Sequence, residues 1–361
     1  MIQVRTKRNG VVIGYGGMGS WHAQCFLNSD AVHLSGIYDI DPSKSKQAED
    51  KGIRAYHSWQ EVLADGEVDF VTLAVPNELH RPLAIEAMAA GKHVVSEKPV
   101  TLSSEDLQAI YDASYQYDRL FTVHQNRRWD ADYLMMKQLY ENKMLGEVFA
   151  IESRVQGSRG IPGDWRGKKE HGGGMMLDWG VHLIDQMIGI VNDRKIERVY
   201  CRCDHITNDE VDDGFKLDLY FEGGLTARIE VGTSHFIFLG RFYMNGVNGS
   251  AKVAGWGCNA DITYCKDWSV KDAKPVVTEA GLTKTMAPRT EDSIVKTEIE
   301  RPKVDVHDFY RNFVAAINGD ASMLITHAQV MRVMLVMEAA FESDRTGLPV
   351  VFNDPGVIDP Q

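Results

Sequence analysis

The stretch Val11-Val12-Ile13-Gly14-Tyr15-Gly16-Gly17-Met18-Gly19 decides the fold. A short apolar run leads into the glycine pattern G-x-G-x-x-G, and a stretch compatible with a helix, residues 20–28, follows. In this context the first glycine permits a tight turn, the second lets the backbone approach a pyrophosphate, and the third permits close helix–strand contact. We therefore predict a dinucleotide at the helix N-terminus, cradled by Gly14, Gly16, Gly17, Met18 and Gly19.

A carboxylate follows the second predicted strand at the distance that such a site needs. Asp39 stands about 20 positions beyond Gly19, where an acidic side chain accepts from the ribose 2′-hydroxyl. Its charge would repel a 2′-phosphate, and residues 40–43 offer no arginine to bind one. NAD is therefore predicted over NADP, although Lys44 leaves NADP open.

From residue 10 to about 124, short apolar runs alternate with helical patterns, which is typical of a parallel sheet built from βαβ units. The predicted helices include 79–90 and 103–117, the latter with Ser103 as its N-cap. The predicted strands are 11–13, 32–38, 54–56, 68–74, 93–96 and 120–123.

After residue 146 the pattern changes to longer alternating strands, predicted at 148–155, 198–206, 215–221 and 226–232. Gly223-Gly224 predicts a hairpin turn. Helices are predicted at 175–190, 307–318 and 326–344, and residues 266–303 are polar and loop-rich. The fold class is thus an α/β N-terminal Rossmann domain, 1–125, followed by an α+β C-terminal domain, 126–361, with a large, mostly antiparallel open sheet.

Composition narrows the function further. The 361 residues carry a net charge of -12, which argues against nucleic acid or anionic membranes as partners and favours small neutral substrates. No apolar run has the length of a membrane span, and the apolar run near the N-terminus is too short for an export signal. The five scattered cysteines lack zinc spacing, so we expect free thiols, no metal, and a cytoplasmic protein.

Two further motifs carry chemistry. Glu97-Lys98-Pro99 follows the fifth predicted strand, so Lys98 would project from the carboxyl edge of the sheet and stabilise an alkoxide. In the predicted helix after Gly172-Gly173-Gly174, the spacing of Asp178, His182 and Asp185 places all three on one polar face that turns to a cleft. An imidazole is a suitable base for an alcohol proton at neutral pH.

These motifs together resemble the Gfo/Idh/MocA oxidoreductase family, and the resemblance runs over nearly the whole chain. It is carried by the glycine loop, by residues 75–80 (VPNELH), by residues 90–99 (AGKHVVSEKP), by residues 126–129 (NRRW) and by residues 178–185 (DWGVHLID). The resemblance implies that Lys98 and His182 share the proton-handling role with the help of Asp178, and it leaves open which of the two is the base. It also implies a homo-oligomer through the C-terminal sheet and a dinucleotide lined by Pro76, Asn77, His80, Glu97 and Lys98.

A narrower resemblance concerns family members that oxidise glycosides at the sugar C3. It rests on residues 124–130 (HQNRRWD) and 163–166 (GDWR). It implies substrate contacts from Asn126, Arg127, Asp164, Trp165, Arg166, Asp178 and His182, and for Asn126, Trp165 and Arg166 structural packing at the domain junction is the alternative.

The predicted function is thus NAD-dependent oxidation of a secondary alcohol, with hydride passing to the nicotinamide C4. The substrate is a sugar or glycoside, with its C3 hydroxyl as the first choice. Alternatives are an inositol or free-sugar dehydrogenase and a redox-assisted glycosidase that forms no net NADH. A sugar sensor without chemistry is disfavoured, because it would not need Lys98, Asp178 and His182.

Overall fold

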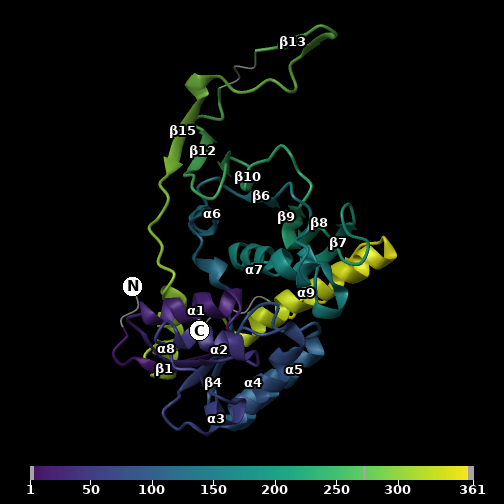
Figure 1. The fold of residues 1–361 in the computed structure, drawn as a ribbon. Helices are drawn as coiled ribbons and strands as arrows, with labels where there is room; N and C mark the ends of the chain where they lie inside the picture. Colours follow the sequence, from purple (N-terminus) through teal and green to yellow (C-terminus); the bar gives the residue numbers. More distant parts are fainter. Residues whose placement is uncertain (1–3, 271–273, 357–361) are drawn as a thin grey trace.

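The computed structural model describes residues 4–270 and 274–356, which form a nucleotide-binding part and a sheet-bearing part (Figure 1). The first part alternates strands and helices as the sequence predicts. Its elements are β1 (Arg8–Ile13), α1 (Gly17–Leu27), β2 (Val32–Tyr38), α2 (Pro42–Glu49), α3 (Trp59–Ala64), β3 (Phe70–Leu73), the short 3-10 helix η1 (Asn77–Leu79), α4 (His80–Ala89), β4 (His93–Ser96), α5 (Ser104–Tyr117) and β5 (Phe121–Val123).

The five strands form one parallel sheet in the order β2-β1-β3-β4-β5, which confirms the Rossmann-type domain. All five strands therefore end at the same edge, and the loops that follow them meet there. The strand predicted at 54–56 is wrong: Ala55 forms only an isolated bridge with Ile37, made by the bonds from Ile37 N to Arg54 O and from Tyr56 N to Ile37 O, and no ladder continues from it.

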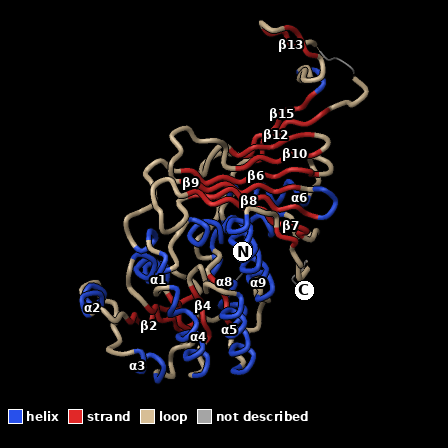
Figure 2. Tube along the Cα trace, turned by 90° about the vertical axis from the view of Figure 1, so that its right-hand side faces the viewer, coloured by secondary structure: helices blue, strands red, loops and turns tan. Residues whose placement is uncertain are grey.

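The second part holds a nine-stranded mixed sheet, whose strands run side by side across the view in Figure 2. The strand order is β15-β12-β11-β10-β6-β9-β8-β7-β16, and every pair is antiparallel except β6 with β9, which confirms a mostly antiparallel sheet. The strands are β6 (Val148–Gln156), β7 (Ile196–Asp204), β8 (Gly214–Phe221), β9 (Thr226–Gly232), β10 (Phe242–Gly246), β11 (Gly249–Val253), β12 (Ala260–Cys265), β15 (Ile294–Ile299) and β16 (Val350–Val351).

The parallel pairing of β6 with β9 matters for the site. Gln156 at the end of β6 lies opposite Gly232 at the end of β9, so the loops after both strands leave the sheet from the same end. The predicted turn at Gly223-Gly224 is present, and both glycines have positive φ (77° and 82°) between β8 and β9.

Helices and short turns complete the second part. Helix α7 (Val181–Ile190) is buried under the sheet and continues directly from a π-helical turn, η5 (Met176–Gly180). The other helices are η2 (Asn126–Trp129), α6 (Ala131–Glu141), η3 (Trp165–Gly167), η4 (Lys169–His171), η6 (Glu222–Gly224), η7 (Glu291–Ser293), α8 (Asp308–Ile317) and α9 (His327–Thr346).

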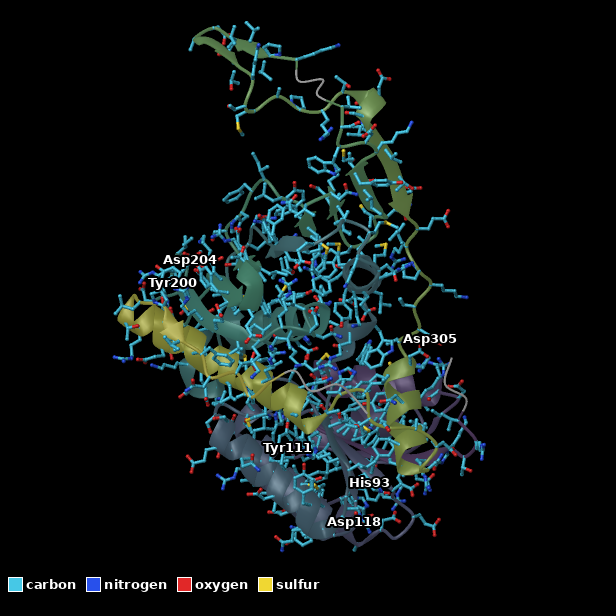
Figure 3. All side chains as sticks on the ribbon, turned by 180° about the vertical axis from the view of Figure 1, so that it is seen from behind. His93, Tyr111, Asp118, Tyr200, Asp204 and Asp305 are labelled. Carbon is cyan, nitrogen blue, oxygen red and sulfur yellow. The ribbon has the colours of Figure 1, made fainter. Side chains whose placement is uncertain are left out.

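Helix α9 connects the two parts. At its start His327 stacks on Tyr111 of α5, with ring centroids 3.9 Å apart, and further along it packs against β7, which carries Tyr200 and Asp204 (Figure 3). Helix α8 packs against the nucleotide-binding part, where the ring centroids of Phe313 and of Phe70 in β3 lie 5.3 Å apart. The prediction that assigned all of 126–361 to the second domain therefore does not describe α8.

Residues 266–270 and 274–293 form an arm that projects from the edge of the large sheet (Figures 1 and 2). The described part of this predicted loop-rich segment includes a short hairpin, β13 (Val276–Thr278) with β14 (Gly281–Thr283), while β15 beyond it joins the large sheet. Among the described residues no helix is both long and apolar enough to cross a membrane. The five cysteines are free thiols.

Candidate active site

The glycine-rich loop leaves open space above its backbone. Gly14 has a φ of +86°, and a Cβ on Gly19 would lie 1.8 Å from the Gly14 carbonyl oxygen, so both positions require glycine. A Cβ on Gly16 or Gly17 would meet no described heavy atom within 4 Å. Gly16 is the N-cap of α1 and supplies no side-chain bond, which leaves the first amides of the helix available to an anion. This cradle fits the pyrophosphate of a dinucleotide, with Met18 half-exposed at its rim.

Asp39 lies beside this loop, at the end of β2. Its carboxylate accepts from the backbone amide of Tyr15 at 2.6 Å and from that of Asp41 at 2.9 Å. The side chain is half-buried, so an oxygen remains within reach of a bound ribose. Lys44 lies in the first turns of α2.

Lys98 and Asp178 bridge the two parts of the molecule. The Lys98 Nζ, from the end of β4, donates to Asp178 Oδ1 at 2.9 Å and to the Asp178 carbonyl oxygen at 2.8 Å. Burial alone would raise the pKa of Asp178, but Lys98 and then Arg166, at 3.2 Å, hold that pKa below its ordinary value. The carboxylate is therefore charged at neutral pH and fixes the ammonium at the domain junction.

His182 is almost fully buried, at 4% exposure, on the first turn of α7. Its Nδ1 lies 3.2 Å from the Oε1 of Gln125, which follows β5. Burial, and then the positive charges of Lys98 and Arg127, lower the pKa of His182 well below its ordinary value. The imidazole is therefore neutral at pH 7, and with Nδ1–H donating to Gln125 its Nε2 keeps a free lone pair.

A cavity of about 560 Å³ opens beside this cluster, within the size range of small-molecule sites. Two tryptophans form one wall: Trp179 and Trp256 have ring centroids 5.9 Å apart, and the Arg127 guanidinium lies 4.3 Å above the Trp179 ring. The lining residues are Arg127, Val155, Gln156, Gly157, Gly160, Pro162, Arg166, Met175, Asp178, Trp179, Val231, Gly232, Thr233 and Trp256.

Four predicted substrate residues are not among the lining residues of this cavity: Asn126, Asp164, Trp165 and His182. Asp164 binds the Arg166 guanidinium at 2.8 Å, and the ring of Trp165 packs 4.6 Å from it, so both position Arg166. Asn126 opens the turn η2. The contact of Trp165 with Arg166 supports the packing alternative for Trp165, and the predicted substrate contact of Asp164 stays a prediction.

Three predicted cofactor residues, Pro76, Asn77 and His80, lie at the turn η1 and at the start of α4. His80 is fully buried, and its two ring nitrogens lie 3.0–3.1 Å from the carbonyl oxygens of Val75, Pro99 and Val100. It therefore holds the loop that carries Lys98, and its predicted contact with the dinucleotide stays a prediction. Pro76 caps η1, and Asn77 donates to the His171 carbonyl at 3.1 Å, which ties that turn to the second part.

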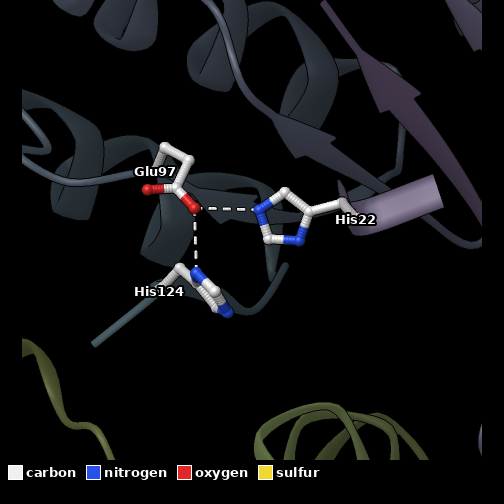
Figure 4. A group of neighbouring side chains, drawn as sticks. All are labelled: His22, Glu97 and His124. Atoms are coloured by element: carbon white, nitrogen blue, oxygen red, sulfur yellow. Dashed lines mark hydrogen bonds and ion pairs between the residues drawn. The ribbon is translucent and has the colours of Figure 1, made fainter. Parts of the chain in front are cut away.

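Glu97 forms the centre of a buried histidine cluster (Figure 4). Its Oε1 lies 2.8 Å from both His22 Nε2 and His124 Nδ1, so this oxygen is engaged inside the protein, and the predicted contact of Glu97 with the dinucleotide stays a prediction. Burial opposes the charge of Glu97, yet His124 and His22 hold its pKa well below the ordinary value. The ligand atoms of His22, Glu97 and His124 lie close enough to bind one metal ion. The 2.8 Å separations are also the usual length of N–H···O hydrogen bonds, and a metal would have to replace the protons in those bonds.

Asp185 also differs from its prediction. It is 2% exposed and forms a two-point ion pair with Arg128, at 2.6 and 2.7 Å, in place of facing the cleft. Polar residues on one face of a helix are expected both where that face lines a cleft and where it meets a buried cation. Here the cation is Arg128, which comes from η2.

Sequence reasoning missed Gln125, Trp179 and Trp256. Gln125 follows a parallel strand at the carboxyl edge, so its position carried a signal. Trp179 adjoins Asp178 in the motif. Trp256 comes from the turn between β11 and β12 and carried no signal that links it to the site.

A parallel sheet with an open glycine cradle, joined to a large mixed sheet through a Lys98–Asp178 contact, defines a two-domain dinucleotide-binding oxidoreductase. The family model of this class, "Oxidoreductase family, NAD-binding Rossmann fold", matches residues 8–125. The "GFO/IDH/MocA C-terminal domain" matches residues 133–252. The chain belongs to the Gfo/Idh/MocA oxidoreductase family.

Three relatives illustrate the range of the family. The crystal structure of an NAD-binding protein from Listeria innocua is 44% identical and has a TM-score of 0.92, covering 96% of this chain and 100% of that one. The scyllo-inositol 2-dehydrogenase (NADP(+)) of Bacillus subtilis is 25% identical over 92% of this chain and 93% of its own. An uncharacterized oxidoreductase of Schizosaccharomyces pombe, C115.03, is 35% identical over 42% of this chain, which spans 41% of that relative's length.

Proposed function

We propose that this protein is an NAD-dependent dehydrogenase that oxidises a secondary alcohol of a sugar, cyclitol or glycoside, with the C3 hydroxyl of a glycoside as the first choice. The observation that carries the proposal is the Lys98–Asp178 pair, held beside a neutral His182 where the two domains meet. Relatives named as inositol dehydrogenases support a polyol substrate.

The residues divide the work as follows. Lys98 Nζ, fixed by Asp178, binds the substrate oxygen and stabilises the alkoxide as the proton leaves. His182 is neutral and can accept the proton at Nε2, so in this proposal His182 is the base and the Lys98 ammonium is the cation that stabilises the alkoxide. NAD held by the glycine cradle at Gly16 and Gly17 would supply the hydride acceptor for this oxidation, which would leave a ketone on the substrate.

The charges around the cavity favour an uncharged substrate. Three cations, Lys98, Arg127 and Arg166, face three carboxylates in direct ion pairs, and the carboxylates are Asp130, Asp164 and Asp178. The local sum is thus zero when His182 is neutral. A polyol, which hydrogen-bonds to such pairs without adding charge, fits better than a sugar phosphate.

Asp39 supports NAD as the cofactor, because its carboxylate beside Tyr15 would repel a 2′-phosphate. We further propose a homo-oligomer through the open sheet, where Phe149 of β6 and Tyr243 of β10 are 49% and 37% exposed. Analytical ultracentrifugation tests the oligomer, and a monomer at micromolar concentration would refute it.

The test of function incubates purified protein with NAD or NADP and a panel of free sugars, cyclitols and glycosides. The expected result is NADH together with a product lighter by two hydrogen atoms, and a higher kcat/KM with NAD than with NADP. Free aglycone without NADH would support redox-assisted cleavage in its place. No change in any substrate would overturn the proposal.

Lys98→Ala tests the role of the ammonium. We expect kcat/KM to fall by roughly 10²–10³-fold or more, as for loss of an oxyanion-stabilising donor, while NAD binding stays nearly unchanged. Lys252→Ala is the matched control, because Lys252 is an exposed lysine of the large sheet paired with Asp261. Equal turnover in Lys98→Ala and Lys252→Ala would refute the role of Lys98.

A further inference from the structure

The candidate substrate cavity does not end at the tryptophans. A second cavity of about 310 Å³ shares Gly157, Gly160 and Thr233 with it and ends at Arg159 and Phe238. Because β6 and β9 run parallel, the loops that follow them start at the same end of the sheet and build this common wall. Figure 2 shows long loops leaving the sheet beside β9. Together the two cavities form one groove.

The far end of the groove carries an unusual apolar loop. Phe236, Ile237, Phe238 and Leu239 follow one another between β9 and β10 and are 84%, 85%, 61% and 56% exposed. Contiguous exposed apolar side chains of this kind mark an interaction site in a water-soluble protein. No sequence motif of the family resemblance includes this loop.

The loop is fixed to the groove wall on both sides of Phe238. The His235 amide donates to the Gly157 carbonyl at 2.7 Å, and the Leu239 amide donates to Gln156 Oε1 at 2.8 Å. Gly157 leaves the floor open, since a Cβ there would meet no described heavy atom within 4 Å. The apolar side chains thus stand at a defined place relative to the reacting groups.

The groove changes character along its length. Asp178 and Arg166 give its inner end hydrogen-bonding groups, Trp179 and Trp256 line its middle, and Phe238 closes its outer end. A single sugar or cyclitol ring bound at Asp178 needs only the first two regions. A second, apolar group on the same substrate would cover the third.

We propose that the substrate is a glycoside with an aromatic aglycone, whose sugar ring lies at Asp178 and Trp179 and whose aglycone lies along Gly157 toward Phe238. This proposal rests on the proposed function and names the substrate class of the same site. The Arg241 guanidinium lies 4.6 Å from the centre of the Trp256 ring, and Trp256 is still 45% exposed, so the exposed part of this ring supports contact with an aromatic group.

The test compares methyl and phenyl glycosides of the same sugar with the wild-type enzyme. We expect kcat/KM to be about tenfold higher or more for the phenyl glycoside, since added apolar contact in a pocket is worth roughly 10–200-fold. Phe238→Ala should remove most of this preference by raising KM for the phenyl glycoside, with kcat and the methyl glycoside unaffected. Leu282→Ala, an equally exposed apolar residue on the arm, is the control.

Calorimetric titration of both glycosides gives a readout that does not depend on turnover. Tighter binding of the phenyl glycoside to wild type than to Phe238→Ala would support the proposal even if neither glycoside is oxidised, in which case only the proposed function fails. Equal affinity and equal kcat/KM for the two glycosides would overturn the proposal while leaving the dehydrogenase function intact. A Phe238→Ala protein with unchanged phenyl preference and a changed oligomeric state would also overturn it, because the loop would then be a subunit contact.

Discussion

At the scale of single residues, the protonation of His182 depends on its immediate neighbours. Burial and the cations Lys98 and Arg127 lower its pKa, while Gln125 supplies a neutral oxygen to Nδ1. The Gln125 Nε2 is buried and has no hydrogen-bond partner among the described atoms. The enzyme thus keeps an uncharged partner at this position, where a carboxylate would satisfy the imidazole better but would charge it.

Gln125→Glu tests this arrangement through the pH profile. A carboxylate beside Nδ1 favours the imidazolium and therefore raises the pKa of His182 from its lowered position. Because the neutral form is the active one, the acidic limb of kcat/KM should move to higher pH, and activity at pH 6 should fall more than activity at pH 8. An acidic limb at the same pH as in wild type would show that His182 does not control the profile.

The site residues that the sequence could predict are those fixed by a local pattern. The glycine loop and Lys98 follow strands whose carboxyl ends must meet, so their juxtaposition needs only the βαβ alternation. Glu97 follows the same rule, but its burial by His22 and His124 depends on side chains from two other elements. Trp256 reaches the cavity only through the register of β11 and β12, which no local pattern specifies.

At the scale of elements, the helix that carries Asp178 and His182 starts irregularly. The sequence predicts one helix over 175–190, but the structure has the π-helical turn η5 before α7, and such turns are common at functional sites. Asp212 holds the start: its carbonyl accepts from Met175 N at 3.0 Å and its Oδ2 from Met176 N at 2.8 Å. No pattern near Asp212 could show this, because it lies on the loop before β8.

Asp212→Ala should lower the free energy of unfolding by about 0.5–2 kcal/mol through loss of the cap, and reduce kcat because Asp178 loses its fixed position. Asp212→Asn keeps an oxygen acceptor and should therefore retain most of the stability and most of kcat. Urea unfolding and steady-state kinetics at pH 7 measure the two effects. Wild-type kcat in Asp212→Ala would contradict the positioning role.

The same side chain makes stability depend on pH. Burial raises the pKa of Asp212 to about 6, above its ordinary value of 3.8, so its contribution is fully present below pH 3.8 and is lost as the pH rises through about 6. Asp212→Asn cannot titrate and should therefore lose less stability than wild type between pH 5 and pH 7. Identical pH dependence in the two proteins would contradict the raised pKa.

At the scale of the whole molecule, the end of the chain returns to the nucleotide-binding part. Tyr310 of α8 lies 2.9 Å from His22 Nδ1 and 3.2 Å from Thr72, which extends the buried network of Glu97 across both chain ends. Arg311 binds Asp30 at 2.9 Å on the same side. The pattern of alternating strands could define the parallel sheet, but a helix some 180 residues after β5 has no local feature that assigns it there.

Phe313→Ala tests whether α8 is part of the nucleotide-binding domain. Phe313 is fully buried against Phe70 of β3, so its truncation should lower the free energy of unfolding by about 3–5 kcal/mol. NAD at 100 times its Kd should raise the free energy of unfolding by about 2.7 kcal/mol in both proteins, because the glycine cradle is the same in wild type and variant. Phe341→Ala on α9, where the ring is 39% exposed, is the control and should stay within about 0.5 kcal/mol of wild type. If Phe313→Ala behaved like Phe341→Ala in denaturant melts, α8 would be a peripheral attachment, and the domain boundary near residue 126 would describe the molecule after all.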